Sequence, residues 1–502
     1  ALVPAGPRRA PAPTGLRRAA EAAPIGTSRV RGPSPASARL AVREPRVGCS
    51  AADHRPPGRA GILPRVLRRI VEQVFGLALR VFFRRIELEG LDRVPAAGPV
   101  MFVLNHPNAL IDPAFLLCLA PRPVAFLAKA PLFRTPVLGL IVRAFDSIPV
   151  HRKQDEGGAV DNRDTFRKAR ELLLRGRAVA IFPEGTSHSD PQLKPLKTGA
   201  ARIALGTGLA DLTIVPAGLY YSAKASFRSD ALVYFGDPLR VAPVGSVGDE
   251  PPPDAVAALT REIDAALRAV TLQAEDIELL RLVERVGRIF TAASDEAWTV
   301  AEAFDLRRRL AAGHAALRAR DPARLDALLA RVRRYERDLA ELGLGPEHLA
   351  PRHITFAGSL RYALRSAFTL GLVLPLALAG TLLHYPSYRA SGMLAARVAG
   401  EYEDMVATVK VLAATLFFPL TWLLAGLAAG HVFSASAGLL VGLLVAPASG
   451  YAALHFWERF ASVAAAARGL LLFLTRKRLL ARLADERQAI RAEILALADL
   501  VS

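Results

Sequence analysis

Short apolar segments alternate with helical patterns between Pro99 and about Arg240. The apolar segments are 100–104, 124–128, 147–150, 178–182, 213–219 and 231–235. The segments between them suit helices and are 113–120, 131–145, 162–177 and 198–206. A regular alternation of strands and helices predicts an α/β fold for residues 91–250, with a mostly parallel sheet flanked by helices.

An arginine-rich helix is predicted just before this domain, from Pro64 to Arg85. Its apolar residues recur at three- and four-residue spacing, and they are Val66, Ile70, Val74, Leu77 and Val81. We expect Phe75, Phe82 and Phe83 to enlarge this apolar face. The pattern is typical of an amphipathic helix in a membrane interface, assigned here to residues 61–90. A helix packed on the neighbouring domain is the alternative.

Three further regions differ in composition. Residues 1–60 are rich in Ala, Pro and Arg without periodicity, so we expect a disordered leader. Residues 251–350 carry Ala, Leu, Arg and Glu in amphipathic patterns and are expected to form a charged helical region. Residues 476–502 suit a basic amphipathic C-terminal helix.

Two uncharged tracts indicate an integral membrane protein, with a transmembrane region at 351–475. The first tract, 366–388, has 23 residues, and the second, 411–457, has 47. A spanning helix needs about 20 residues, so the second tract predicts two spans that turn near His431 and Ser434. A buried helix of a soluble domain remains an alternative for the first tract.

The basic residues leave the membrane orientation open. Residues 476–478 and the basic helix near Arg65 both favour the cytoplasmic side, whereas three spans would separate them. Either the tract 366–388 is re-entrant or interfacial, or residues around 470–474 complete a fourth crossing. The third alternative is that this chain does not follow the positive-inside rule, by which basic residues lie on the cytoplasmic side.

Composition narrows the class of protein. The chain has 502 residues, 52% of them hydrophobic, and a net charge of +19, which excludes disordered and fibrous classes. Two cysteines exclude a disulfide framework and suggest a reducing compartment. Nucleic acid is not an expected partner, because no aromatic platform or recognition helix accompanies the charge. The expected partner of this basic, apolar chain is the lipid bilayer.

Four polar clusters lie where predicted strands end, which is where open α/β sheets place their sites. The first contains Asn105, His106 and Asp112. A neutral imidazole can accept a proton near pH 7, and a carboxylate bonded to its other nitrogen fixes the tautomer. Alternatively, Asp112 before Pro113 is a helix N-cap and His106 bonds only to backbone.

The other clusters offer groups for a polar ligand. Residues 182–188, Phe-Pro-Glu-Gly-Thr-Ser-His, form a turn that could present Glu184 and free amide groups. Arg152, in 148–152, and Lys197, in 195–199, could hold a phosphate. A surface turn and solvated charges are the alternatives.

In this order, NHPNALID, IPVHR, FPEGTSH and IVPAGLYY resemble the glycerophospholipid acyltransferase superfamily over about residues 65 to 240. The string at 182–199 looks most like the fungal-type glycerol-3-phosphate/dihydroxyacetone-phosphate acyltransferases and their bacterial relatives. Five residues separate His106 from Asp112, where the commonest family pattern has four. Ser187 stands where the family often has an Arg.

The resemblance implies a function and a set of roles. His106 would be the general base, oriented by Asp112, and a glycerol hydroxyl would attack the acyl thioester directly. The implied substrate-binding residues are Asn105, Arg152, Glu184, Gly185, Thr186, Lys197 and Arg228.

The implied donor is acyl-CoA or an acyl carrier protein thioester, and the acceptor is glycerol 3-phosphate, in phospholipid biosynthesis at the cytoplasmic face. Lysophosphatidate (1-acylglycerol 3-phosphate) is the alternative acceptor. The sequence shows no metal cluster, and the resemblance implies no cofactor. A membrane-bound lipid-binding protein with a degenerate site is the alternative class.

Overall fold

The computed structural model describes residues 62–152, 161–244, 250–294, 297–346 and 356–501. The expected leader, 1–60, lies outside the described residues. Eight strands form one sheet in the order β1-β7-β6-β2-β5-β3-β4, and β8 pairs with β6. The strands are β1 Arg85–Glu89, β2 Val100–Leu104, β3 Val124–Lys129, β4 Ile148–Val150, β5 Ala178–Ile181, β6 Thr213–Tyr221, β7 Asp230–Phe235 and β8 Leu239–Arg240.

The sheet is mostly parallel, as the sequence predicted. Only β6 with β7 and β6 with β8 are antiparallel. In the centre, Leu104 of β2 lies opposite Ala217 of β6, and Val103 lies opposite Ile181 of β5. Parallel neighbours end at one edge of the sheet, so the segments after β2, β4 and β5 and the end of β6 meet there.

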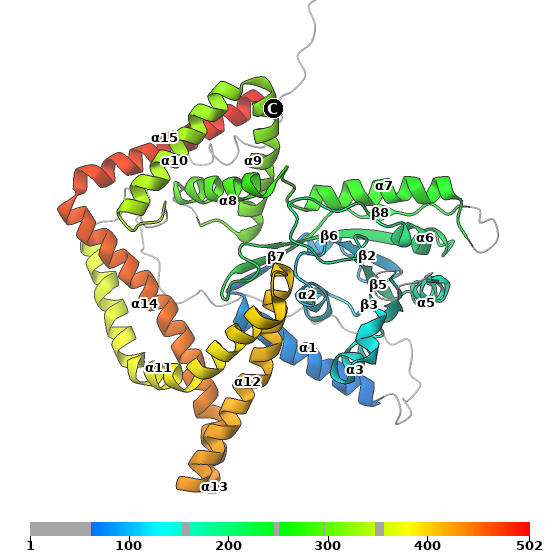
Figure 1. The fold of residues 1–502 in the computed structure, drawn as a ribbon, viewed down its shortest axis with the longest axis horizontal. Coiled ribbons are helices and arrows are strands. Elements are labelled where there is room, and N and C mark those ends of the chain that lie inside the picture. The colour runs from blue at the N-terminus through cyan, green and yellow to red at the C-terminus, as the bar shows by residue number, and fades with distance from the viewer. Residues whose placement is uncertain (1–61, 153–160, 245–249, 295–296, 347–355, 502) are drawn as a thin grey trace, which may run out of the picture.

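Helices cover both faces of this sheet (Figure 1). Side chains of β2 alternate between two hydrophobic cores: Phe102 packs in one, Met101 in the other. The first core contains α1 Ile62–Phe82 and α2 Ile111–Leu119. The second lies under three helices, which are α5 Arg163–Leu174, α6 Gly199–Leu205 and α7 Pro253–Val270. Shorter elements are η2 Leu91–Arg93, η3 Ala130–Arg134 and α3 Pro136–Ala144.

The charged helical region forms a separate core with the C-terminal helix. Residues of α8 Ile277–Ala292, α9 Val300–Arg320, α10 Pro322–Glu341 and α15 Lys477–Val501 pack in one cluster. Arg331 of α10 pairs with Glu486 and Glu493 of α15, and hydrogen bonds from Arg331 hold the pKa of Glu486 below its usual value. Residues 253–270 were expected in this region, but α7 packs on the sheet.

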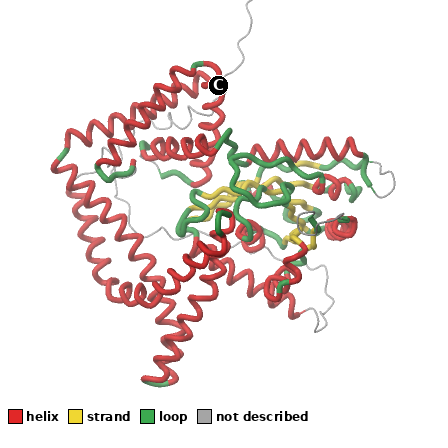
Figure 2. Tube along the Cα trace, viewed as in Figure 1, coloured by secondary structure: helices red, strands yellow, loops and turns green. Residues whose placement is uncertain are grey.

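Within the described residues, three helices are long and apolar enough to cross a membrane: Leu364–Ala399, Glu403–Val432 and Ala435–Ala464. They belong to α11 Phe356–Ala399, α12 Glu403–Val432, and the continuous run of α13 Ala435–Leu440, the π-helical turn η5 Val441–Val445 and α14 Ala446–Thr475. The chain turns between α12 and α13, at the expected place. These helices extend away from the sheet (Figure 2).

Helix α11 is bent. It first runs beside α14 and then turns back towards the sheet beside α12 (Figure 1). Gly380 lies against the backbone of Ser449 in α14, whereas Ser387 hydrogen-bonds Thr421 of α12 at 2.6 Å. Pro375 and Pro386 lie inside the helix, and proline is a common cause of kinks.

Helix α1 divides its apolar residues between two faces. The expected stripe is solvent-exposed, from 39% at Val81 to 60% at Leu77. Phe82 and Phe83 are buried in the sheet's core, and Phe75 packs against it. The expectation that these phenylalanines enlarge the stripe was wrong, because they face the domain. The range 61–90 was also too long for one helix, since residues 85–89 form β1.

Candidate active site

His106, in the loop after β2, meets Asp112 in the first turn of α2. His106 Nδ1 lies 2.8 Å from Asp112 Oδ2. The Asp112 side chain is fully buried, while that of His106 is 18% exposed. The carboxylate therefore orients the ring through Nδ1, and Nε2 is left as the nitrogen that can face a substrate.

Three donors converge on the Asp112 carboxylate. Besides His106, the Asn108 amide donates to Oδ2 at 2.6 Å and the Tyr221 hydroxyl donates to Oδ1 at 2.6 Å. Burial, together with the neighbouring Asp112, raises the pKa of Tyr221 well above its usual value, so this hydroxyl remains a donor. Asp112 is not the N-cap of α2: that position is Leu110, and it has no side-chain cap.

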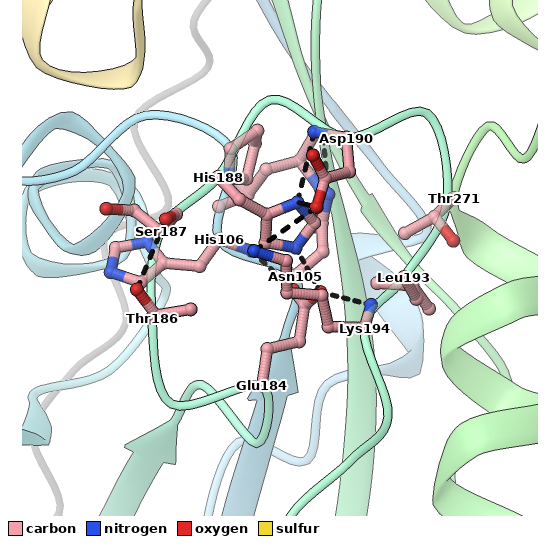
Figure 3. Close-up of polar contacts among 12 residues, drawn as sticks. Asn105, His106, Glu184, Thr186, Ser187, His188, Asp190, Leu193, Lys194 and Thr271 are labelled. Atoms are coloured by element: carbon pink, nitrogen blue, oxygen red, sulfur yellow. Dashed lines mark hydrogen bonds and ion pairs between the residues drawn. The ribbon is translucent and has the colours of Figure 1, made fainter. Parts of the chain in front are cut away.

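The segment after β5 holds the backbone of His106 from two sides. Glu184 Oε1 accepts from the His106 amide at 3.1 Å, and the His188 amide donates to the His106 carbonyl at 3.1 Å. The fully buried Glu184 also contacts the His188 ring and accepts from the Lys194 amide at 2.9 Å (Figure 3). Glu184 thus braces the loop from within.

The ring of His106 is also fixed by stacking. It lies 3.9 Å from the Phe182 ring, centroid to centroid, with 11° between the planes. Phe182 in turn stacks on Phe126 of β3. Asn105 is turned the other way: its side-chain amide donates to the Leu219 carbonyl and accepts from the Leu219 amide. It therefore joins the end of β2 to β6.

Two cations converge on Gly185. Arg152 Nη1 donates to the Gly185 carbonyl at 3.1 Å, and a Cβ at Gly185 would lie 2.4 Å from Lys197 Nζ. Gly185 has φ of +73°, so the left-handed turn and the close lysine both require glycine here. The structure thus brings Arg152, Gly185 and Lys197 together, at the same sheet edge as His106. Thr186 Oγ1 is bonded to the Ser187 carbonyl at 3.3 Å.

Arg228 lies elsewhere. Its guanidinium pairs with Glu458 of α14 and donates to the carbonyls of Arg80, Val81 and Phe83 at the end of α1. This arginine therefore ties α14 to α1, and it is not among the cations near Gly185. In the described residues, no group of three or more His, Cys, Asp or Glu side chains could hold a metal ion.

Three residues with contacts in the site were missed from the sequence: Tyr221, His188 and Thr408. His188 and Tyr221 belong to the strings FPEGTSH and IVPAGLYY, which offered a signal for both. Thr408 accepts from the Leu110 amide at 3.1 Å. It lies in α12, far along the chain, and no local pattern marks it.

Two family models match the chain. Residues 85–220 match the family described as Acyltransferase, and residues 282–501 match the domain described as Glycerol-3-phosphate acyltransferase 2 C-terminal domain. The first range contains the sheet edge with His106, and the second contains α8 to α15 except the start of α8. The chain therefore combines an acyltransferase domain with a region that matches this C-terminal domain. It is an enzyme of the acyltransferase class.

The chain is also similar to three fungal proteins. A protein of Schizosaccharomyces pombe named as an uncharacterized acyltransferase is 26% identical, over 84% of this chain and 79% of its own length. Glycerol-3-phosphate O-acyltransferases 1 and 2 of Saccharomyces cerevisiae are 26% and 28% identical, over 68% and 52% of this chain. The matched regions span 58% and 37% of those two enzymes.

Other relatives match shorter parts of the chain. The chloroplastic 1-acyl-sn-glycerol-3-phosphate acyltransferase LPAT1 of Arabidopsis thaliana is 32% identical over 28% of this chain and 38% of its own. Among solved structures, the 1-acyl-sn-glycerophosphate acyltransferase PlsC of Thermotoga maritima is 20% identical with a TM-score of 0.32, covering 41% of this chain and 79% of PlsC.

Proposed function

We propose that this protein transfers a fatty acyl group from acyl-CoA or an acyl carrier protein thioester to glycerol 3-phosphate, in phospholipid biosynthesis. The contact between His106 Nδ1 and the buried Asp112 is the observation that carries the acyl-transfer chemistry. The acceptor rests on the C-terminal domain match and on the two Saccharomyces cerevisiae relatives.

In the proposed reaction, His106 Nε2 takes the proton of a glycerol hydroxyl as its oxygen attacks the thioester carbonyl. A C–O bond forms, the C–S bond breaks, and the imidazolium returns its proton to the departing thiolate. Asp112 stabilises the imidazolium and holds its orientation. Proximity of the two bound substrates supplies much of the remaining acceleration.

The acceptor's phosphate would bind where Arg152 and Lys197 meet Gly185. Arg offers a planar pair of donors to phosphate oxygens, and Lys adds a point charge. The contacts of Arg152 and Lys197 around Gly185 support this assignment. Glu184 would act indirectly, since its carboxylate contacts the His106 amide rather than open space.

The same proposal places the catalytic domain at the cytoplasmic face of a membrane. Its support is the set of three long apolar helices and the exposed apolar face of α1. An acyl chain and a phospholipid product partition into the bilayer, so a site anchored beside it has its apolar substrate and product close by.

The test is acyl transfer by the purified full-length protein in detergent, followed by thiol release from acyl-CoA. Glycerol 3-phosphate, dihydroxyacetone phosphate and lysophosphatidate are supplied separately. We expect release with glycerol 3-phosphate, and release with lysophosphatidate alone would reject the proposed acceptor.

The base is tested in the same assay. His106→Ala should lower kcat by about 10²- to 10⁴-fold, because it removes a positioned proton acceptor. His431→Ala, at an exposed end of α12, is the matched control and should leave kcat unchanged. Full activity in His106→Ala would show that the imidazole is not the base.

A further inference from the structure

The first turns of α12 are built into the catalytic domain. Ala407 is fully buried and Val411 is 2% exposed, and both belong to the hydrophobic cluster of Phe102 and Phe115. Lys410 Nζ donates to the Ala225 carbonyl at 2.7 Å. One wall of this core is therefore supplied by a helix long and apolar enough to span a membrane, well beyond the matched range 85–220.

This helix reaches the loop that carries the base. The Asn108 amide bonds to Asp112, and the Ile111 amide donates to the Asn108 carbonyl at 2.9 Å. The Leu110 amide instead donates to Thr408 Oγ1 at 3.1 Å. Thr408 is 4% exposed, so this hydrogen bond lies in the interior, where an unmade bond is not replaced by water.

The backbone conformation of this loop shows why a hydrogen-bond acceptor from another element, Thr408, stabilises it. Ala109 has φ of +35°, a sign that is uncommon for a residue with a side chain and that persists when the surroundings enforce it. It directly precedes Leu110, whose amide is held by α12. The contact with Thr408 therefore helps to enforce the loop conformation that brings Asp112 to His106 Nδ1.

We propose that Thr408 is a positioning residue for acyl transfer, acting through the Leu110 amide on the pair His106 and Asp112. The inference rests on the proposed function. If so, the geometry of His106 and Asp112 depends on how α12 packs against the catalytic domain. A helix long and apolar enough to span a membrane would then affect the rate of acyl transfer without contacting substrate.

The experiment compares three variants of the full-length protein with wild type. Thr408→Val keeps the shape of the side chain and removes the acceptor, Thr408→Ser keeps the acceptor, and Thr415→Val is the matched control. Thr415, two turns further along α12, donates to the Val411 carbonyl of its own helix. The measurements are kcat, KM for both substrates, and the thermal unfolding midpoint in detergent.

We expect Thr408→Val to lower kcat about 10-fold or more with each KM changed less than about 2-fold, because a small misplacement of a catalytic group costs rate rather than binding. Thr408→Ser should recover most of the rate, and Thr415→Val should match wild type. If Thr408→Val does not fold, Thr408→Ala carries the same expectation.

Two results would overturn the inference: a kcat for Thr408→Val within about 2-fold of wild type, or a loss in Thr408→Ser as large as in Thr408→Val. These differ from failure of the proposed function, in which wild-type protein itself shows no transfer to any of the three acceptors.

Discussion

Tyr221 shows how a single buried hydroxyl shapes the site. It donates to Asp112 Oδ1, the oxygen that does not contact His106. An unmade hydrogen bond to a buried acceptor costs about 1–3 kcal/mol. Tyr221 orients Asp112, and Asp112 orients His106, the proposed base. Part of this cost should therefore appear as a higher barrier to acyl transfer.

We therefore expect Tyr221→Phe to lower kcat by about 10-fold, the effect of about 1.4 kcal/mol, with little change in KM. The matched control is Tyr220→Phe. Tyr220 is equally buried, its burial raises its pKa to about 12, and it packs on Phe304 on the other side of the sheet. Equal losses of kcat in both variants would contradict the assigned role of Tyr221.

The sequence predicted the pair at the centre of the site but not its surroundings. His106 and Asp112 are close along the chain, so a local motif was enough to join them. Tyr221 and Thr408 reach the same loop through strand order and helix packing, which no local pattern reports. Arg228 was proposed to bind the phosphate, but its guanidinium instead hydrogen-bonds Glu458, which is 230 residues away in the chain.

At the scale of elements, continuous apolar strands were the easiest to predict. β2 and β5 are buried on both faces, so nearly every residue is apolar and the signal is strong. β1, with the sequence RIELE, lies at the sheet's edge, where alternating charges resemble the end of the preceding helix. The sequence showed the prolines in α11, but it did not predict that the helix bends or in which direction.

Helix α1 offers an element-scale prediction about the membrane. Its exposed face carries Val66, Ile70, Val74, Leu77 and Val81, while the opposite face packs on the sheet. Apolar side chains bordered by arginines suit the boundary of lipid headgroups and acyl chains. We expect a polarity-sensitive fluorophore on Leu77→Cys to shift to the blue in vesicles and to be quenched by nitroxide-labelled lipids.

The protein for this measurement lacks Cys49 and Cys118, both changed to Ser. Arg261→Cys is the control, on the exposed side of α7 across the sheet from α1. A blue shift at Leu77→Cys without quenching by the labelled lipids would mean that protein, rather than lipid, covers this face.

At the scale of the whole molecule, the contacts bear on how the chain crosses a membrane. α15 packs with α8, α9 and α10, and Phe304 of α9 packs on Leu232 of the sheet. The start of α12 lies in the sheet's core. The regions before α11, between α11 and α12, and after α14 therefore belong to one body.

On the proposal that the apolar helices span a membrane, such a body would lie on one side of the bilayer, and the helices would cross it an even number of times. α12 and α14 form a pair joined by the turn at Ser434, and in this arrangement the bent α11 would enter the membrane and return to the same side. His384 and Trp422, joined at 2.8 Å, and Ser387 and Thr421 satisfy one another's polar groups near the bend. This arrangement would place the basic residues near Arg65 and at 476–478 together on the proposed cytoplasmic side.

We therefore expect a membrane-impermeant maleimide to divide three single-cysteine variants of the cysteine-free protein into two groups. Arg261→Cys in the catalytic domain and Arg478→Cys in α15 should react from the cytoplasmic side, in inverted vesicles. Ser434→Cys at the tip of the α12–α13 turn should react only from the other side, in intact cells. Reaction of Arg478→Cys from outside, with Ser434→Cys reacting from the cytoplasmic side like Arg261→Cys, would mean three crossings. The single body formed by the catalytic domain and α15 would then have to separate.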